Sequence, residues 1–259
     1  MTTQTVHYRA TCALILAAVL ISGCQVTPPE AVAKQASVES IADAYVEALL
    51  NRYPSMATSY ALPGFRHDQL FDNSQAALQR WHDQEDAFLG AVRAQAAPSK
   101  IGTRDWITYG FLIESLSASR ATRVCQKALW ETSTTTAWHT GLPFIFDIQP
   151  LVTNADRADA LTRLRAVAGY INTEIENLTL GLAQGYSSPR LTVTEVPEQV
   201  RALLQPDNPF LNMGKRSDNP LFQDAVQREY EQSIQPALNR FADFIETQYL
   251  PKAREDIAI

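Results

Sequence analysis

Hydrophobic residues recur at spacings of three and four along most of the chain beyond residue 37, and this is the period of one face of an α-helix. The longest such run follows Asn154. Its apolar positions alternate steps of three and four: Leu161, Leu164, Ala168, Ile171, Ile175, Leu178 and Leu182. The pattern predicts one long helix with a coiled-coil-like seam, and Gly185 fits the position just beyond its C-terminal end.

Shorter helical patterns are bounded by residues that favour helix ends. One begins after Ser37 and ends near Tyr53, before a proline, and a second begins near Ser74. A third follows Thr103. Its inner face is predicted to carry Trp106, Tyr109, Ile113 and Leu116.

The C-terminal third predicts two more helices separated by a loop. Residues 196–204 form a short helical pattern, and the last helix begins near Pro220 and is expected to kink at Pro236. Residues 205–219 are rich in Pro, Asn and Asp and predict a loop, while residues 191–196 are the single strand candidate. The predicted fold class is therefore all-α, an irregular antiparallel helical bundle of about six helices.

One long segment, residues 131–153, does not follow a helical pattern. Long irregular segments inside compact domains are often functional. This one either lines a cleft or forms a hydrophobic plug over the end of the bundle.

The N-terminus has a different pattern. Arg9 precedes an almost unbroken apolar run of about ten residues, from Cys12 to Ile21. A helix that spans a bilayer needs roughly 20 apolar residues, so the run is typical of an export signal.

The apolar run ends in a four-residue motif, Ile21, Ser22, Gly23 and Cys24. The motif resembles a lipobox, in which the cysteine is acylated and becomes the new N-terminus once the leader is removed. Several acyl chains on one residue anchor a protein stably. The alternative is an ordinary signal peptide, or an uncleaved anchor, with a chance cysteine. Gln25, in place of the Asp typical of inner-membrane lipoproteins, favours the outer membrane facing the periplasm.

These patterns predict three parts: a lipoprotein signal peptide (1–23), a tether (24–36) and one helical domain (37–259). The tether contains two prolines and reads as a flexible link between the membrane and the domain. The expected location is the bacterial cell envelope, with the N-terminal lipid in contact with the membrane.

Charge and cysteine content exclude two classes of protein. The chain has 22 Lys and Arg against 28 Asp and Glu, and loss of residues 1–23 with their one arginine changes the net charge from −6 to −7. An acidic chain without a basic stripe binds nucleic acid poorly. With Cys12 removed and Cys24 acylated, Cys125 has no partner for an intrachain disulfide.

The sequence contains no assembled catalytic motif. His67, His82 and His139 fall in none of the HExxH, HxxE or HxH arrangements, and a metal site needs three or four convergent ligands. Residues 185–189 lack the second glycine of a nucleophile elbow. Cys125 is predicted to be a small core residue rather than a nucleophile. Two pairs of acids are spaced two apart on predicted helices and are expected on solvated faces: Glu174 with Glu176, and Glu229 with Glu231.

A series of short motifs nevertheless occurs in a distinctive order. The motifs are Ala44, Tyr45, Leu49 and Leu50 before Arg52, Tyr53, Pro54, Ala57 and Thr58; Leu161 and Leu164; Gly181, Gly185, Pro189 and Arg190; and Tyr249, Leu250, Pro251, Ala253 and Arg254. Their order and spacing over residues 38–259 resemble the N-terminal half of the bacterial family named domain of unknown function 885, whose members are often exported lipoproteins. Members look like zinc-dependent peptidases, with His-Glu, Pro-Gly-His and Glu-Gly-Trp elements in the C-terminal half.

The resemblance implies that the metal-binding and catalytic elements are missing from this chain. No catalytic or metal-binding residue is then expected here, zinc is expected only in the missing C-terminal half, and a separately encoded C-terminal half is the partner that this hypothesis predicts. Arg190, and with less support Tyr186, are the candidates for positioning a substrate. The alternative for Arg190 is capping the preceding helix or pairing with a local acid.

Three functional hypotheses follow. The first is a lipid-anchored envelope protein that resembles the non-catalytic half of a zinc-dependent peptidase and is inactive alone. The second is a non-enzymatic helical binding or scaffolding lipoprotein of the outer membrane. The third is an enzyme of an unrecognised type.

Overall fold

The computed structural model describes residues 37–257, and the regular secondary structure in this range is helical. Its one β-type pairing is an isolated parallel bridge between Pro189 and Arg254. The all-α prediction is confirmed. Within the described range, no helix combines the length and apolarity needed to cross a bilayer.

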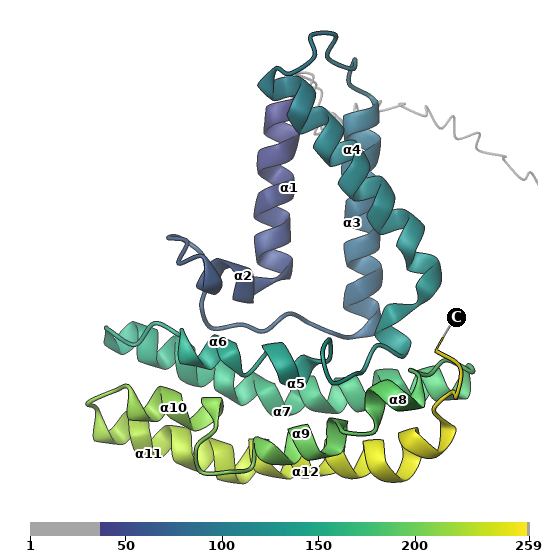
Figure 1. Cartoon of the computed structure of the whole chain (residues 1–259). Coiled ribbons are helices and arrows are strands. Elements are labelled where there is room, and N and C mark those ends of the chain that lie inside the picture. Colours follow the sequence, from purple (N-terminus) through teal and green to yellow (C-terminus); the bar gives the residue numbers. More distant parts are fainter. Residues whose placement is uncertain (1–36, 258–259) are drawn as a thin grey trace, which may run out of the picture. The chain divides into compact units, whose positions relative to one another are not determined.

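Three helices form one region of the domain, which we call the arm: α1 (Val38–Arg52), α3 (Gln75–Arg93) and α4 (Arg104–Thr122). Each begins at a predicted cap, because the side chains of Ser37, Ser74 and Thr103 accept hydrogen bonds from the backbone N–H three residues later. Figure 1 shows the three helices standing side by side. Their shared core is small and consists of Ile41, Leu89, Val92, Leu112 and Leu116.

The predicted inner face of α4 is only partly correct. Leu116 is buried, but the second buried position is Leu112, and Trp106 is 42% exposed. Tyr109 and Ile113 are partly buried against the arm core. At 100° per residue, Trp106 lies about 80° from Leu116 around the helix axis, which turns it away from the face that packs on the other two helices.

The second region, which we call the base layer, is built on α7 (Asn154–Ala183). Thr153 and Asp156 form a reciprocal capping box at its start, and Gly185 beyond its end has a φ of +83°. The seam predicted for this helix is confirmed, since Leu164, Ile171 and Leu178 are fully buried in the main core.

The other helices of the base layer pack along α7 (Figure 1). They are α9 (Val196–Ala202), α10 (Pro209–Lys215), α11 (Pro220–Glu229) and α12 (Gln235–Phe244). The predicted kink near Pro236 takes the form of a π-helical turn, Tyr230–Ile234, directly before α12. A π turn changes the hydrogen-bond register and so accommodates the missing N–H of the proline.

Two sequence predictions in this region are wrong. The predicted loop at residues 205–219 contains α10, whose Asn208 cap and first-turn Pro209 start a helix that buries Phe210 and Met213. The strand candidate at residues 191–196 contains α8 (Arg190–Val193). In both cases the helices are only four to seven residues long, too short to show a clear apolar period.

Short helices and loops connect the arm to the base layer: α2 (Pro54–Ser59), α5 (Trp138–Gly141) and α6 (Phe144–Asp147) (Figure 1). Arg163 of α7 joins several of them. Its fully buried guanidinium donates to the Gln69 carbonyl (2.9 Å), Thr58 Oγ1 (2.9 Å) and Gln149 Oε1 (2.6 Å). Burial lowers the pKa of Arg163 to about 10.

Candidate functional site

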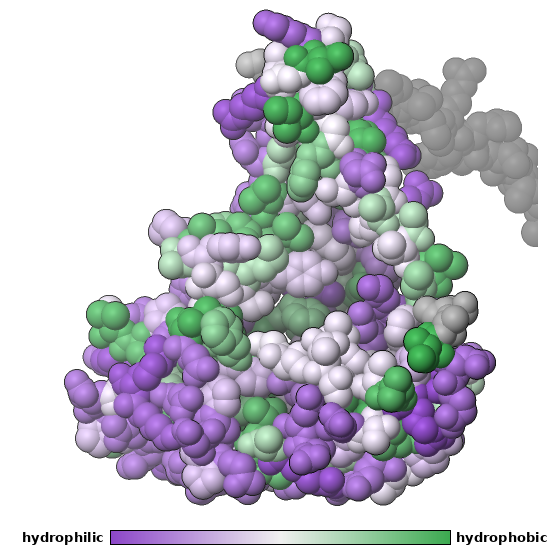
Figure 2. Space-filling view, in the orientation of Figure 1, coloured by the Kyte–Doolittle hydropathy of each residue, from purple (hydrophilic) through white to green (hydrophobic). Residues whose placement is uncertain are grey.

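A cavity of about 640 Å³ lies where the connecting segments meet α7 and the lower ends of α1 and α3. Figure 2 shows the surface hollowed between the arm and the base layer, with hydrophobic side chains inside the hollow. The volume falls in the range of about 300–1,000 Å³ that is typical of small-molecule sites. Its lining mixes aromatic and aliphatic side chains with a few polar ones: Tyr53, Phe71, Leu78, Trp138, Leu142, Phe144, Ile145 and Tyr170, and Arg52, Asn73, Lys127, Glu131, Thr135, Glu174 and Asn177.

Glu174 of α7 is the most unusual polar residue in the lining. Its carboxylate accepts a hydrogen bond from the Asn73 side-chain amide at 3.2 Å. Burial raises the pKa of Glu174 to about 7, against the opposing effect of the Asn73 hydrogen bond and with a further rise from the negative charge of Glu131. The predicted solvated face is therefore wrong for this residue, although Glu176 is exposed.

An amide network fixes the segment around Glu174. The Asn73 amide also donates to the Tyr170 carbonyl at 3.1 Å, and Asn177 donates back to the Asn73 carbonyl at 2.8 Å. Gln75, at the start of α3, donates to Asn177 Oδ1 at 2.9 Å. These bonds join α7 to residues about a hundred positions earlier in the chain, and they hold the acid in place.

Aromatic rings form the wall next to the acid. The rings of Phe71 and Tyr170 meet edge to face at 5.2 Å, and Tyr53 lies 5.7 Å from Phe71. The Arg52 guanidinium lies over Tyr53 and Phe71, at 5.4 and 5.5 Å from the ring centres. Burial raises the pKa of Tyr170 above its usual range, so its hydroxyl is neutral at physiological pH.

The irregular segment at residues 131–153 contributes both of its predicted alternatives. Phe146 and Ile145 are buried in the main core, as expected of a plug. Thr135, Trp138 and Phe144 line the cavity, as expected of a cleft wall. The segment can do both because α5 and α6 turn one side of their short helices toward the core and the other toward the hollow.

His139 lies in the same segment but is occupied by a structural contact. Its Nε2 pairs with Gln199 Oε1 at 2.8 Å. Burial lowers the pKa of His139, so the ring is neutral near pH 7.

The substrate-positioning candidates from the sequence lie elsewhere. Arg190 Nε contacts Glu255 Oε1 at 2.6 Å, which is the local acid pairing considered as the alternative. Tyr186 is half-buried, and its backbone N–H donates to the Gly181 carbonyl. Neither residue lines the cavity. Their role in binding a substrate stays a prediction.

The remaining candidates are quickly placed. The lipobox residues Ile21, Ser22, Gly23 and Cys24, and with them the signal peptide and tether, lie outside the described residues. Cys125 is a half-buried free thiol in a 3₁₀ turn just after α4. Within residues 37–257, no three His, Cys, Asp or Glu side chains come together as metal ligands, so the described side chains do not fit a zinc ion.

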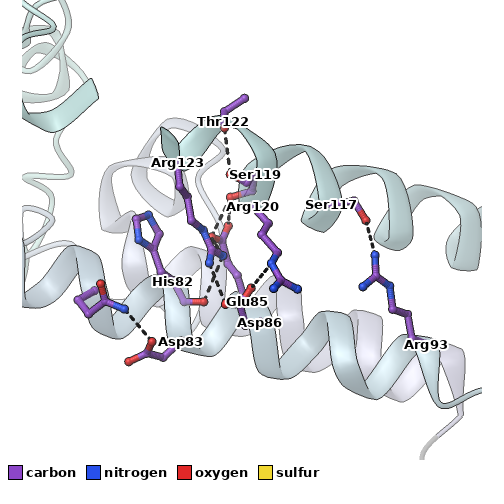
Figure 3. Close-up of polar contacts among 11 residues, drawn as sticks. His82, Asp83, Glu85, Asp86, Arg93, Ser117, Ser119, Arg120, Thr122 and Arg123 are labelled. Atoms are coloured by element: carbon purple, nitrogen blue, oxygen red, sulfur yellow. Dashed lines mark hydrogen bonds and ion pairs between the residues drawn. The ribbon is translucent and has the colours of Figure 1, made fainter. Parts of the chain in front are cut away.

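A second polar cluster joins α3 to the end of α4 (Figure 3). Arg123 reaches Glu85 at 3.2 Å and Asp86 at 2.9 Å, and Ser119 donates to both carboxylate oxygens of Glu85. The hydrogen bond from Arg123 lowers the pKa of Asp86. The acids in this cluster are matched by a guanidinium, which Glu174 lacks, so we interpret the cluster as a structural link.

Sequence reasoning missed the cavity residues, although one signal was present. Tyr170, Glu174 and Asn177 follow one another at steps of four and three on α7. They form a second stripe beside the hydrophobic seam. A long helix that carries two such stripes packs against neighbours on two sides.

The comparisons with known proteins agree with this fold. The family model described as bacterial protein of unknown function (DUF885) matches residues 54–257, and the chain therefore belongs to this family. No curated protein matches the sequence.

A solved structure shares the fold. It is the crystal structure of the "putative lipoprotein from Colwellia psychrerythraea", with a TM-score of 0.68 and 15% sequence identity. The match covers 85% of this chain and 42% of that protein, so the chain spans about two fifths of the length of the solved protein. At this identity the likeness concerns the fold.

Proposed function

We propose that this protein is a lipid-anchored component of the bacterial cell envelope, outer-membrane and facing the periplasm, whose helical domain is the N-terminal, non-catalytic half of a zinc-peptidase-like protein. The observation that carries the proposal is the structural match, which extends over most of this chain and 42% of a protein described as a putative lipoprotein. Membership of the family supports it. In this proposal the chain supplies a wall of the binding cleft, and zinc with its ligands belongs to the other half.

The lipid anchor can be tested with matched cysteine variants. The wild-type chain is expected to take up radiolabelled palmitate and to sediment with outer-membrane fractions. Cys24→Ser should lose the label and leave the membrane, because the thiol is the acylation site. Cys12→Ser, in the expected leader, should keep both. Labelling that survives in Cys24→Ser would contradict the anchor.

The half-enzyme proposal has two tests. The DNA downstream of the reading frame should encode the His-Glu and Pro-Gly-His elements of the family, and unrelated sequence there would count against the proposal. Zinc titrated into the purified chain should show no stoichiometric binding by calorimetry. Tight one-to-one binding would show that this chain contains a metal site.

A second candidate is a non-enzymatic binding lipoprotein. It is favoured by the cavity, which is assembled from described residues alone and contains a polar group fixed by an amide network. An autonomous binding domain should unfold in one sharp transition and bind little hydrophobic dye. A broad transition with strong dye binding would favour the half-protein instead, because its packing surface would be exposed.

A further inference from the structure

The cavity contains an acid that the fold itself does not neutralise. Glu174 has a hydrogen bond from Asn73 but no ion pair with a Lys, Arg or His within the described residues. A carboxylate removed from water is costly unless it is paired. Its place in the cavity wall leaves room for a ligand to supply the positive charge.

The cationic side chains of the lining already have partners of their own. Lys127 pairs with Glu131 one helical turn away, at 3.6 Å. Arg52 donates to the Asp72 carbonyl at 2.6 Å and lies over the rings of Tyr53 and Phe71. Neither forms a salt bridge with Glu174, which is therefore available to a cation that enters from outside.

The rest of the lining matches an apolar group joined to that cation. Phe71 and Tyr170 present a pair of aromatic rings beside the acid, and Trp138 and Phe144 line the same hollow. Aromatic faces attract ammonium groups and also pack against hydrocarbon. A site with one carboxylate and several aromatic walls has the usual features of organic-cation recognition.

We propose that the cavity binds an organic ammonium ion that carries an apolar group, with the Glu174 carboxylate accepting hydrogen bonds from the ammonium and Phe71, Tyr170 and Trp138 contacting the apolar part. This inference deepens the binding role proposed for the cavity and rests on it. It requires neither the lipid anchor nor a second half of the protein.

A series of matched probes tests the charge requirement. 4-Phenylbutylamine, 4-phenylbutanol and 4-phenylbutyrate share a phenyl group and a four-carbon chain and differ in charge. Calorimetric titration of the full chain at pH 8 should show that the amine binds at least tenfold more tightly than the alcohol, and that the carboxylate binds weakest. Equal affinity for amine and alcohol, or a preference for the carboxylate, would overturn the proposal.

Two glutamine variants on the same helix test the residue. Glu174→Gln keeps the shape and one acceptor oxygen but removes the charge, so affinity for the amine should fall at least tenfold while binding of the alcohol is unchanged. Glu176→Gln, on the exposed side of α7, should bind all three probes like the wild type. Unchanged binding of the amine by Glu174→Gln would overturn the assignment.

The pH dependence provides an independent readout. The charged and titratable groups around Glu174 are Glu131 and Lys127 from the 3₁₀ turn and the segment after it, Arg52 from α1, and the tyrosines Tyr170 and Tyr249. Of these, Glu174 itself has a pKa near 7, so affinity for the amine should fall as the pH is lowered from 8 to 6. A flat profile down to pH 5 would contradict ionic binding by this residue.

Failure of this inference is distinguishable from failure of the proposed function. If none of the three probes binds, the ammonium site is wrong, while palmitate labelling and membrane fractionation still decide the anchor. If the amine binds as expected and Cys24→Ser stays on the membrane, the ammonium site stands and the anchor is wrong.

Discussion

The arm and the base layer solve the problem of burying a helical surface in different ways. The arm has a core of five buried residues, and apolar side chains stay exposed at its end and along α4: Ile101, Trp106, Ile107 and Phe111. The base layer has a much larger core around α7, in which Leu164, Ile171 and Phe241 are fully buried. The arm adds polar links, such as the Arg123 cluster, to a hydrophobic core that is small.

The difference indicates that stability is uneven across the domain. Free energy from burial is roughly proportional to the apolar area removed from water, so the base layer is expected to be the last part to open and the arm the first. The cavity lies between them. Its shape therefore depends on residues that join the two regions, and substitutions there should separate the contributions of each.

The largest effect is expected at Arg163, which joins α7 to the connecting segments. Arg163→Met should lower the free energy of unfolding by about 3–5 kcal/mol, because it leaves Thr58, Gln149 and the Gln69 carbonyl without their buried donor. Denaturant titration measures the loss. Arg165→Met on the exposed side of the same helix has only a loose ion pair with Glu229 and should change stability by less than about 0.5 kcal/mol. Equal effects would mean that the joint carries no special load.

The next effect depends on pH and involves Glu174. Its folded-state pKa of about 7 lies above the ordinary value of 4.5. The folded state therefore binds more protons between these values, and stability falls as pH rises through this window. Glu174→Gln should remove the fall and be more stable than the wild type by up to about 3 kcal/mol at pH 8. At pH 4 the two should be similar. Thermal unfolding across this range is the measurement, and parallel pH profiles would contradict the raised pKa.

A smaller effect is expected where the 3₁₀ turn Lys127–Leu129 packs on α7. A Cβ added at Gly181 would lie 1.8 Å from the Leu129 carbonyl oxygen, so Gly181→Ala should push the turn away and cost about 1–3 kcal/mol. Gly169→Ala, on the same helix with open space around it, should instead stabilise by about 0.5–1 kcal/mol, because alanine favours helix. Chemical denaturation of both variants distinguishes the clash from helix propensity. A stabilised Gly181→Ala would mean that the turn moves freely.

The smallest global effect is expected in the arm. Glu85→Gln weakens the ion pair with Arg123 and should cost about 1–2 kcal/mol. The cost should be local. Hydrogen exchange should speed up in α3 and α4 and stay unchanged in α7 and α12. Uniform acceleration across both regions would show that the arm and the base layer unfold together.

Much of the fold could be predicted because the signals are local. Ser37, Ser74 and Thr103 cap their helices through backbone groups three residues away, and Gly185 follows the long helix as its sequence position indicates. Short helices such as α10 were missed, because a seven-residue helix offers too few positions to show a period. The inner face of α4 was missed in part, because the face that becomes buried depends on where α1 and α3 lie.

The candidate site could not be predicted in the same way. Glu174 has the same spacing from Glu176 as any pair on a solvated helix, and only the approach of Asn73, 101 residues earlier in the sequence, encloses it. The sequence by itself determined the all-α class, the main helix ends and the family resemblance, since periodicity and capping act over a few residues. The tertiary structure alone decided which acid is removed from water and which aromatic rings surround it, because desolvation depends on everything that packs around a group and not on its neighbours in sequence.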